Sequence, residues 1–387
     1  MAERRVPRIR FKGFEEDWEQ RKLGEVVNEI TRTDENSDAP VMMITASDGF
    51  INQSERYSTD NAGQSLRRYI LLERGELAYN HGASKLRPYG SCFALTTEEK
   101  ARVPFVYHCF STEREEPELL SLVLNGKSVE LQLRKIVSSG ARMDGLLNIS
   151  FEEYSSIPIN LPIKLEQTKI VDFFRSLDKV ISLHQRKLEK LKILKKAMLE
   201  KMFPKNGEKV PEIRFSGFAD DWEQRKLGEL AFITTGKLDA NAAKRDGEYN
   251  FFTCGKEILK TNSYAFDGEA ILINGNGDLG YTRKYVGKFN AYQRTYVLQG
   301  FVMDYEYIEH AIHKFLPDKI KYESIGGAMP YIKIDSLMNL ELTIPVVQEA
   351  VVVTRFLNEL DSLLSLHQRK LEKLRQIKKS MLERMFV

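Results

Sequence analysis

The sequence predicts an α+β protein in which two mixed α/β domains are separated by two long helices that pair as an antiparallel coiled coil. The two halves are related by an internal pseudo-twofold repeat. Three observations predict this organisation. A segment is repeated at the front of each half, a helical segment is repeated at its end, and the stretches between them are unlike each other but rich in strand patterns.

The front repeat is nearly verbatim. The nonapeptide DWEQRKLGE occurs twice, within a longer match between residues 9–26 and residues 213–230, so the copies lie 204 residues apart. Each copy holds one of the two tryptophans of the chain, Trp18 and Trp222. No catalytic constellation surrounds either copy. We therefore interpret the repeat as part of a frame, in which each tryptophan anchors a domain near the helices.

The two middle stretches, residues 26–160 and 230–342, contain β-branched and aromatic runs punctuated by Gly, Asn and Asp. This pattern predicts short strands joined by long loops. Helices are predicted only at a few places, such as residues 116–125 and 305–315. Because the two middles do not repeat each other, they are where the halves differ.

Residues 275–280, GNGDLG, match the GxGxxG pattern of dinucleotide-binding loops. That loop must lead directly into a helix, so that the pyrophosphate meets the helix N-terminus. Here the next residues, YTRKYVGKF, alternate as a strand does. The segment is therefore predicted to be a hairpin or loop without a bound dinucleotide.

The repeated tail predicts the two long helices. The decapeptide SLHQRKLEKL stands at residues 182–191 and again, 183 residues later, at 365–374. The difference between the two spacings means that the first half carries 21 more residues in its middle. Apolar residues recur in steps of three and four, which is a heptad seam. The predicted seam positions are Leu177, Ile181, His184, Leu188 and Leu191 in the first copy, and Leu360, Leu364, His367, Leu371 and Leu374 in the second.

Prolines at 162 and 345 stand just before the two helices, each of which is predicted to be about 35 to 40 residues, or roughly 50 to 60 Å, long. A helix of that length with one narrow apolar stripe needs a partner, and its own duplicate has the matching stripe. The sequence divides into four segments, with domains at 1–160 and 208–343 and helical spacers at 161–207 and 344–387.

Two seam positions are histidines. His184 and His367 occupy equivalent places near the middle of each helix. They are either tolerated at half-exposed positions or, if the helices pair antiparallel, brought together at the pseudo-twofold axis, where they help to set the register. We adopt the second as a hypothesis.

Composition excludes several classes of protein. Of 387 residues, 42% are hydrophobic, yet no run approaches the roughly 20 apolar residues of a membrane span. The basic first residues lack the apolar core of a secretory signal. Three cysteines without CxxC spacing fit free thiols in a reducing cytoplasm better than disulfides or a zinc site. We expect a cytoplasmic protein with no metal site.

Sequence motifs give no support for catalysis. The chain contains no HExxH, GxSxG or P-loop pattern, no methyltransferase loop of the DPPY or NPPF type, and no convincing nuclease cluster. We therefore expect no catalytic residues and no cofactor bound by this chain, and a binding role becomes the favoured class.

Charge points to a nucleic acid only through its distribution, since the formal net charge is +3. The first predicted helix holds eleven Lys and Arg against five Asp and Glu over residues 164–201, although part of this is the solvated face of a coiled coil. Basic, amide and aromatic side chains also gather in Gly-rich loops of the middles, and these types suit phosphates and base edges. The candidate DNA-binding residues are Asn80, His81, Lys85, Arg87 and Tyr89 in the first middle, and Asn274, Asn276, Arg283, Lys284, Tyr292, Gln293 and Arg294 in the second.

The complete arrangement resembles the specificity subunit (HsdS) of type I restriction-modification systems. The residues that carry the resemblance are the paired front repeats, the approaches LPIKLEQTKI at 161–170 and IPVVQEAVVV at 344–353, and the helices of the LHQRKLEKLK type. The resemblance extends over essentially the full chain. The order Glu166-Gln167 in the first approach is reversed to Gln348-Glu349 in the second.

The resemblance implies two target-recognition domains, each reading one half of a split DNA site, held apart by the two helices. It also implies a subunit that is not itself catalytic. Two modification subunits (HsdM), which bind S-adenosylmethionine and methylate adenine N6, would dock on it, and restriction subunits (HsdR), which use ATP and Mg²⁺ to cut DNA, would join them. Two alternatives remain open at this point, a stand-alone DNA-binding regulator with a duplicated reader and a coiled-coil scaffold for proteins.

Overall fold

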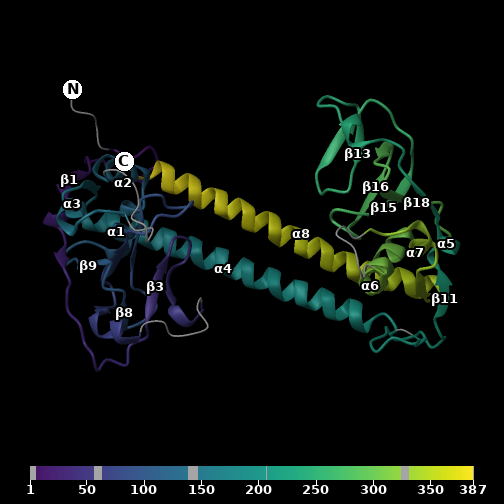
Figure 1. The fold of residues 1–387 in the computed structure, drawn as a ribbon, viewed down its shortest axis with the longest axis horizontal. Helices are drawn as coiled ribbons and strands as arrows, with labels where there is room; N and C mark the ends of the chain where they lie inside the picture. Colours follow the sequence, from purple (N-terminus) through teal and green to yellow (C-terminus); the bar gives the residue numbers. More distant parts are fainter. Residues whose placement is uncertain (1–5, 56–62, 138–146, 206, 324–330, 387) are drawn as a thin grey trace. The chain divides into compact units, whose positions relative to one another are not determined.

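The structure is a computed structural model that describes residues 6–55, 63–137, 147–205, 207–323 and 331–386. The chain forms two compact units. Unit 1 combines Met1–Leu183 with Lys370–Val387, and unit 2 is His184–Arg369. Each unit therefore contains one domain and part of both long helices (Figure 1). Within the described residues, no helix has the length and apolar character needed to cross a membrane.

In unit 1, most of the short strands precede three α-helices, and one last strand follows these helices. Its strands are β1 (Glu19–Lys22), β2 (Asn28–Glu29), β3 (Met42–Thr45), β4 (Gly49–Asn52), β5 (Ile70–Glu73), β6 (Leu77–Asn80), β7 (Ser91–Ala94), β8 (Lys100–Val103), β9 (His108–Ser111) and β10 (Pro158–Leu161). Its helices are the 3₁₀ turns η1 (Leu23–Glu25), η2 (Gln53–Glu55) and η3 (Gly63–Arg68), and α1 (Pro117–Leu124), α2 (Lys127–Ile136) and α3 (Phe151–Ser155).

Unit 2 follows the same plan with fewer residues. Its strands are β11 (Glu223–Lys226), β12 (Phe232–Thr235), β13 (Tyr249–Phe252), β14 (Ile258–Thr261), β15 (Glu269–Asn274), β16 (Thr282–Val286), β17 (Phe289–Ala291), β18 (Thr295–Gln299) and β19 (Glu341–Ile344). Its helices are α5 (Leu227–Leu230), η4 (Ala240–Ala242), α6 (Tyr305–Glu323) and α7 (Ile334–Met338). The strand after GNGDLG is β16, which confirms the predicted hairpin.

The two unlike middles contain the same sheet. Its strand order is β2-β9-β6-β7 in unit 1 and β12-β18-β15-β16 in unit 2, with antiparallel pairing throughout. In both units a short strand of the front repeat, β1 or β11, pairs with the strand that leads into a long helix, β10 or β19. The duplication therefore includes the domains as well as the repeated ends.

The long helices have the predicted length. They are α4 (Lys164–Lys201) and α8 (Val347–Arg384), each of 38 residues. In unit 1, Lys378 of α8 donates to Asp178 of α4 at 2.6 Å, and in unit 2, Lys195 of α4 donates to Asp361 of α8 at 2.5 Å. These pairs occupy equivalent positions in the repeat. Within each unit, rising numbers on one helix meet falling numbers on the other, so the paired segments run antiparallel (Figure 1).

Each front repeat is fixed to the helices by its tryptophan. Trp18 and Trp222 are both 2% exposed and pack edge-to-face against the phenylalanine that follows a long helix, Phe386 in unit 1 and Phe203 in unit 2. The predicted anchoring role of the tryptophans is thereby confirmed.

A buried carboxylate at the start of each long helix binds the same repeat. Arg10 forms a two-point ion pair with Glu166 in unit 1, and Arg214 forms the equivalent pair with Glu349 in unit 2. The two glutamates are separated by 183 residues, the spacing of the helical repeat, and both are fully buried. Despite the reversed order in the second approach, the glutamate therefore keeps its position in the repeat, and only the glutamine changes position.

The two seam histidines are in contact, as the antiparallel hypothesis requires. Nδ1 of His184 lies 2.8 Å from Nδ1 of His367, and His367 is only 6% exposed. One of the two ring nitrogens donates a hydrogen bond to the other. A polar contact at a single level of a seam favours the register that makes it.

Replacing both histidines with leucine is expected to raise stability by roughly 1 kcal/mol or more, because apolar side chains bury more favourably in the seam. The helices of the variant should pair in more than one register, since polar seam residues specify which register forms. Thermal unfolding and light scattering of the full chain measure the two effects. If neither stability nor oligomeric state changes, the histidine pair does not set the register.

Two further histidines lie inside unit 2 on α6. Burial lowers the pKa of His310 and His313 to about 4. Nε2 of His310 contacts Oδ1 of Asn358 at 3.0 Å, and His313 contacts the hydroxyl of Thr282. Both rings are therefore neutral in the folded protein near neutral pH.

Unit 2 is expected to lose stability as the pH falls from about 6.5 towards 4. The unfolded histidines take up protons near pH 6.5, whereas the folded ones do so only near pH 4, so acid favours the unfolded state. The loss should reach about 2 kcal/mol for each ring by pH 5. Denaturant unfolding at several pH values measures it, and a His310→Gln and His313→Gln double variant should give a flatter profile. Equal pH slopes for the two proteins would contradict this assignment.

Candidate nucleic-acid interface

The two groups of predicted DNA-binding residues lie on equivalent connections of the shared sheet. Asn80 ends β6 and Asn274 ends β15, and the following loops lead into β7 and β16 respectively. The sequences of these loops are unrelated, so their equivalence appears only in the fold. Each unit thus presents the same hairpin with different side chains.

In unit 1, the first two predicted residues hold loops together. Asn80 donates to the carbonyl of Ile44 and accepts from the amide of Gly82. His81 is buried, and its Nδ1 and Nε2 each lie 2.7 Å from a backbone carbonyl, those of Leu147 and Val106. These two side chains therefore bind the start of the hairpin to neighbouring loops of unit 1.

The rest of this hairpin is partly accessible. Lys85 is exposed. Arg87 donates to the carbonyl of Asn125 at 2.6 Å, and burial lowers its pKa. Tyr89 is half-buried, and its carbonyl accepts from the hydroxyl of Tyr79. Lys85 is therefore the predicted residue in unit 1 most open to a phosphate.

In unit 2, the hairpin again divides into supporting and accessible residues. Asn274 is buried and its backbone closes the loop through Tyr281 and Gly280, whereas Asn276 is half-exposed at the loop tip. Gln293 donates to Asp239 at 2.7 Å, and Tyr292 is half-buried at the same junction. Arg294 is exposed. Asn276 and Arg294 are thus open to a ligand.

Neighbouring residues of β16 face opposite sides of the sheet, which separates two predicted contacts. Lys284 points to α6, where its ammonium group donates to Glu306 at 2.9 Å and lies 3.2 Å from Glu309. Arg283 lies on the other side, 5.2 Å from the ring centre of Phe252 and 5.5 Å from that of Tyr281, and donates to the carbonyl of Lys256. Lys284 therefore forms ion pairs inside unit 2, whereas Arg283 contacts the loop that contains Lys256.

Three distant loops meet the β15–β16 hairpin. The carbonyl of Cys254 accepts from the amide of Asp278, the carbonyl of Arg294 accepts from the amide of Gly275, and the carbonyl of Gly275 accepts from Ile332. This meeting of loops brings exposed Lys256, Tyr281, Tyr331 and Lys333 to the same region as Arg294. We name these five residues, with Asn276, the unit 2 loop surface.

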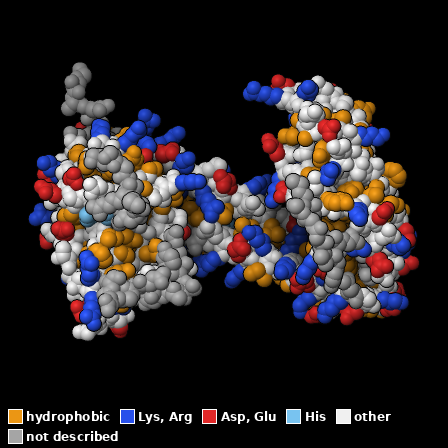
Figure 2. All heavy atoms as spheres, in the orientation of Figure 1, with side chains coloured by type: hydrophobic (Ala, Val, Ile, Leu, Met, Phe, Trp, Pro, Cys, Tyr) orange, Lys and Arg blue, Asp and Glu red, His pale blue; other side chains and the backbone are white. Residues whose placement is uncertain are grey.

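Sequence reasoning missed four members of the unit 2 loop surface, namely Lys256, Tyr281, Tyr331 and Lys333. They lie on three separate segments, and no single segment stands out in composition. Charge alone does not find the surface either, because basic and acidic side chains are interspersed over the face drawn in Figure 2. Among the described residues, no cluster of His, Cys, Asp or Glu is arranged to hold a metal ion.

Comparison with known proteins decides the family. The model of the type I restriction modification DNA specificity domain matches residues 15–193 and 219–376, which together make up most of the chain. The chain belongs to the type I restriction-modification DNA specificity family. The two matched ranges correspond to the two halves of the repeat, as the resemblance of the sequence predicts.

Relatives within this family match parts of the chain. The specificity subunit of the type I enzyme EcoDI from Escherichia coli is 38% identical over 159 residues, which are 41% of this chain and 35% of that protein. The MjaVIII specificity subunit from Methanocaldococcus jannaschii is 20% identical over 283 residues, 64% of this chain and 65% of that protein. The alignments thus span about a third and just under two thirds of these two relatives.

Solved structures share the fold over nearly the full length. The type I S subunit from M. genitalium has a TM-score of 0.61 at 13% identity and covers 99% of both chains. A chain from a structure of the assembly and conformational transition of the type I system has a TM-score of 0.55 at 16% identity, covering 95% of this chain and 97% of that one. The predicted fold class is therefore confirmed.

Proposed function

We propose that this chain reads a bipartite, asymmetric DNA sequence as the specificity subunit of a type I restriction-modification complex, one half-site with each unit. Family membership supports the general role. The feature that supports two different half-sites is the pair of equivalent hairpins, β6–β7 and β15–β16, which share a framework but no side-chain pattern. Equivalent positions with unlike basic, amide and aromatic residues suit recognition of unlike bases.

Mapping of N6-methyladenine by single-molecule sequencing tests this function. A host that carries the complete system is compared with one that lacks this chain, and a split methylated motif should disappear with the chain. Exchanging residues 275–281 for an unrelated hairpin should alter one half of the motif and leave the other unchanged. Alteration of both halves, or of neither, would count against the assignment of one half-site to each unit.

Partner docking is proposed at apolar positions that the repeat preserves on the surface of the helices. Val180 and Leu183 of α4 are 40% and 49% exposed, and their equivalents on α8, Leu363 and Leu366, are 41% and 39% exposed. The two side chains of each pair are three residues apart and so share one helix face, and contiguous apolar patches on such a face are suited to contact with a partner. We assign one modification subunit (HsdM) to each pair.

The reactive groups would come from the partners, in a complex that we place in the cytoplasm. S-adenosylmethionine would bind the HsdM subunits, and ATP with Mg²⁺ would bind the restriction subunits (HsdR). This chain would supply DNA selection and position the methyltransferases, with no catalytic residue of its own.

Co-purification distinguishes the proposal from a stand-alone DNA-binding regulator. The tagged chain should retain a methyltransferase subunit when the two are co-expressed. Sequence-specific DNA binding by the isolated chain, with no retained methyltransferase, would favour the regulator instead.

A further inference from the structure

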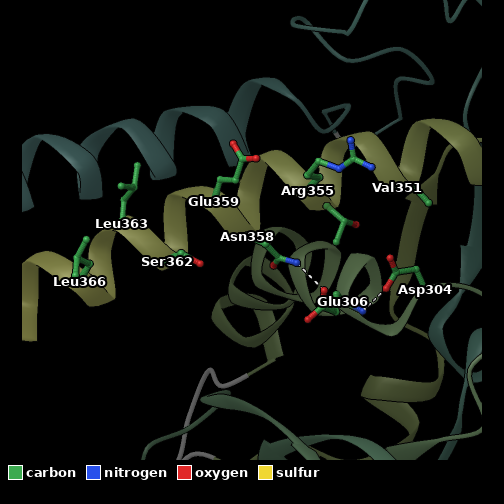
Figure 3. Close-up of a pocket in the computed structure, with 10 residues that line it drawn as sticks. Asp304, Glu306, Val351, Arg355, Asn358, Glu359, Ser362, Leu363 and Leu366 are labelled. Atoms are coloured by element: carbon green, nitrogen blue, oxygen red, sulfur yellow. Dashed lines mark hydrogen bonds between the residues drawn. The ribbon is translucent and has the colours of Figure 1, made fainter.

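One helix of each domain is bonded to a long helix of the same unit. This helix is α1 in unit 1 and α6 in unit 2, and the strands before them, β9 and β18, occupy the same place in the shared sheet. In unit 1, Arg175 of α4 forms a two-point ion pair with Glu118 of α1, with distances of 2.5 and 3.0 Å. In unit 2, Asn358 of α8 donates to Glu306 of α6 at 2.6 Å, as Figure 3 shows. The side-chain oxygen of Asn358 also lies 3.0 Å from Nε2 of His310 in α6.

These contacts occupy equivalent positions, although the residues on the long helices differ. Asn358 stands 183 residues after Arg175, which is the spacing of the helical repeat. Glu118 and Glu306 are each the second residue of their helix. The two unlike halves therefore share a glutamate at the start of this helix, and a long-helix residue that contacts the helix at two points.

The same helix is bonded to the strand that leaves the hairpin proposed to read DNA. Three residues after the glutamate of unit 1, Ser121 accepts from the amide of Ala94 in β7 at 2.8 Å. Three residues after the glutamate of unit 2, Glu309 lies 3.2 Å from the ammonium group of Lys284 in β16. Ser121 and Glu309 are both buried, at 8% and 7% exposed. A second contact is thus made at the same position with different chemistry.

A third contact lies four residues further along the chain in each unit. Asn125 exchanges two hydrogen bonds with the backbone of Cys92 in β7. His313 bonds to the hydroxyl of Thr282 in β16. In both units this strand residue stands two positions before the partner of the second contact. Because positions three and four residues apart share one helix face, the three contacts form a row, which we name the contact row.

The contact row ends beside the reading hairpin. In unit 1, the carbonyl of Asn125 also accepts from Arg87 at 2.6 Å, and Arg87 lies in the β6–β7 hairpin. In unit 2, Thr282 directly follows Tyr281 of the unit 2 loop surface. Each unit therefore has a continuous series of contacts from a long helix to its hairpin.

The first contact fixes direction more than it adds stability. Arg175 has a side chain that is 56% exposed, and ion pairs at such positions contribute little to the free energy of unfolding. Two parallel hydrogen bonds to one carboxylate nevertheless restrict the orientation of the helix that carries it. Base recognition needs such restriction, since its contacts must be held within about 0.5 Å of the productive geometry.

We propose that Arg175 and Asn358 are positioning residues for DNA specificity, and that each sets the orientation of its own reading hairpin through the contact row of its unit. The three positions are bonded in both halves while most of the residues differ, so the geometry is retained where the sequence is not. This inference rests on the proposed function, because it takes the two hairpins to read the two half-sites. It adds that specificity in each half depends on a long-helix residue outside the hairpin.

Two single variants of the full chain, Arg175→Ala and Asn358→Ala, test the inference in the complete complex with HsdM. Alanine is the residue best suited to a helix and removes only the contact. Initial rates of methyl transfer from labelled S-adenosylmethionine are measured on a duplex with the correct split motif and on duplexes with one wrong base pair in either half. The ratio of the two rates measures discrimination within one protein sample, so a smaller folded fraction does not alter it.

Each variant should reduce discrimination about tenfold in one half of the motif only, which is the size of a typical single-base preference. The two variants should affect opposite halves. A merely structural role would instead lower the rates on all duplexes by the same factor. The charge-exchanged variant, Glu118→Arg with Arg175→Glu, should restore the half that Arg175→Ala relaxes, because it remakes the ion pair.

Matched controls lie one helical turn further along each long helix. Lys179 and Ser362 occupy equivalent positions and are exposed, so Lys179→Ala and Ser362→Ala should leave both ratios within about twofold of the wild type. Unchanged ratios for Arg175→Ala and Asn358→Ala, or relaxation of both halves by either, would overturn the positioning role while the proposed function stands. If the wild-type complex does not discriminate in two separate half-sites, the proposed function fails and the positioning role fails with it.

Discussion

Replacing Glu349 with alanine is expected to destabilise unit 2 by about 3–5 kcal/mol, the usual result of breaking a buried ion pair. Glu349 is fully buried and accepts from Nε and Nη2 of Arg214, both at 2.7 Å, and from the indole nitrogen of Trp222 at 3.1 Å. Without the carboxylate, Nε of the part-buried guanidinium group and the buried indole N–H lose their acceptor, and Nη2 keeps only the carbonyl of Asp220. Denaturant unfolding of the full chain, followed by tryptophan fluorescence, measures the loss.

The equivalent substitution in unit 1 provides an internal control. Glu166 is also buried and binds Arg10 at two points, but the indole nitrogen of Trp18 has no hydrogen-bond partner within the described residues. Glu166→Ala should therefore cost about 1 kcal/mol less than Glu349→Ala. The exposed pair of Arg225 and Glu229 serves as a second control, and Glu229→Ala should have little effect. A Glu349→Ala variant no less stable than Glu229→Ala would contradict the buried role.

The long helices could be predicted from the sequence because their determinants are local and repeated. The heptad stripe, the preceding prolines and the duplicated histidines together predict two long helices, their antiparallel pairing and the histidine contact. The front repeat likewise indicates a frame, although the ion pairs of Arg10 and Arg214 were not predicted. They join residues more than 130 positions apart, and nothing in the local pattern identifies the glutamate as their partner.

The recognition surface could be predicted only in part, because composition does not say where a polar side chain points. Asn80, His81 and Lys284 are residue types that suit DNA, but in the fold their polar groups bind backbone carbonyls or carboxylates. Lys256 and Lys333 were not predicted because only backbone contacts between distant segments, those of Cys254 and Ile332 with the β15–β16 hairpin, bring them to the unit 2 loop surface. The periodicity of a helix is visible along the chain, whereas a surface built from several loops is not.

Replacing Lys256, Arg294 and Lys333 together with alanine is expected to weaken DNA binding of the assembled complex about a hundredfold or more. All three cations are exposed, and under the proposed function each would neutralise a phosphate; loss of such contacts weakens binding to all sequences alike. The slope of log K against log salt should become shallower by about 0.9 for each contact that is lost. Fluorescence anisotropy with labelled duplexes at several salt concentrations measures both quantities.

Two other residues of the unit 2 loop surface are expected to affect the sequence specificity of DNA binding more than its affinity. Asn276→Ala and Tyr281→Ala change side chains that can meet base edges or stack, so they should relax one half of the methylated motif while the salt slope stays the same. Lys284→Met is the contrasting variant, because the ion pairs of Lys284 with Glu306 and Glu309 lie inside unit 2. It should lower stability and leave the affinity of the folded complex for DNA unchanged. If the triple variant keeps its affinity and salt slope while Lys284→Met loses DNA binding, the nucleic acid meets unit 2 on the side of α6, and the unit 2 loop surface is not the reader.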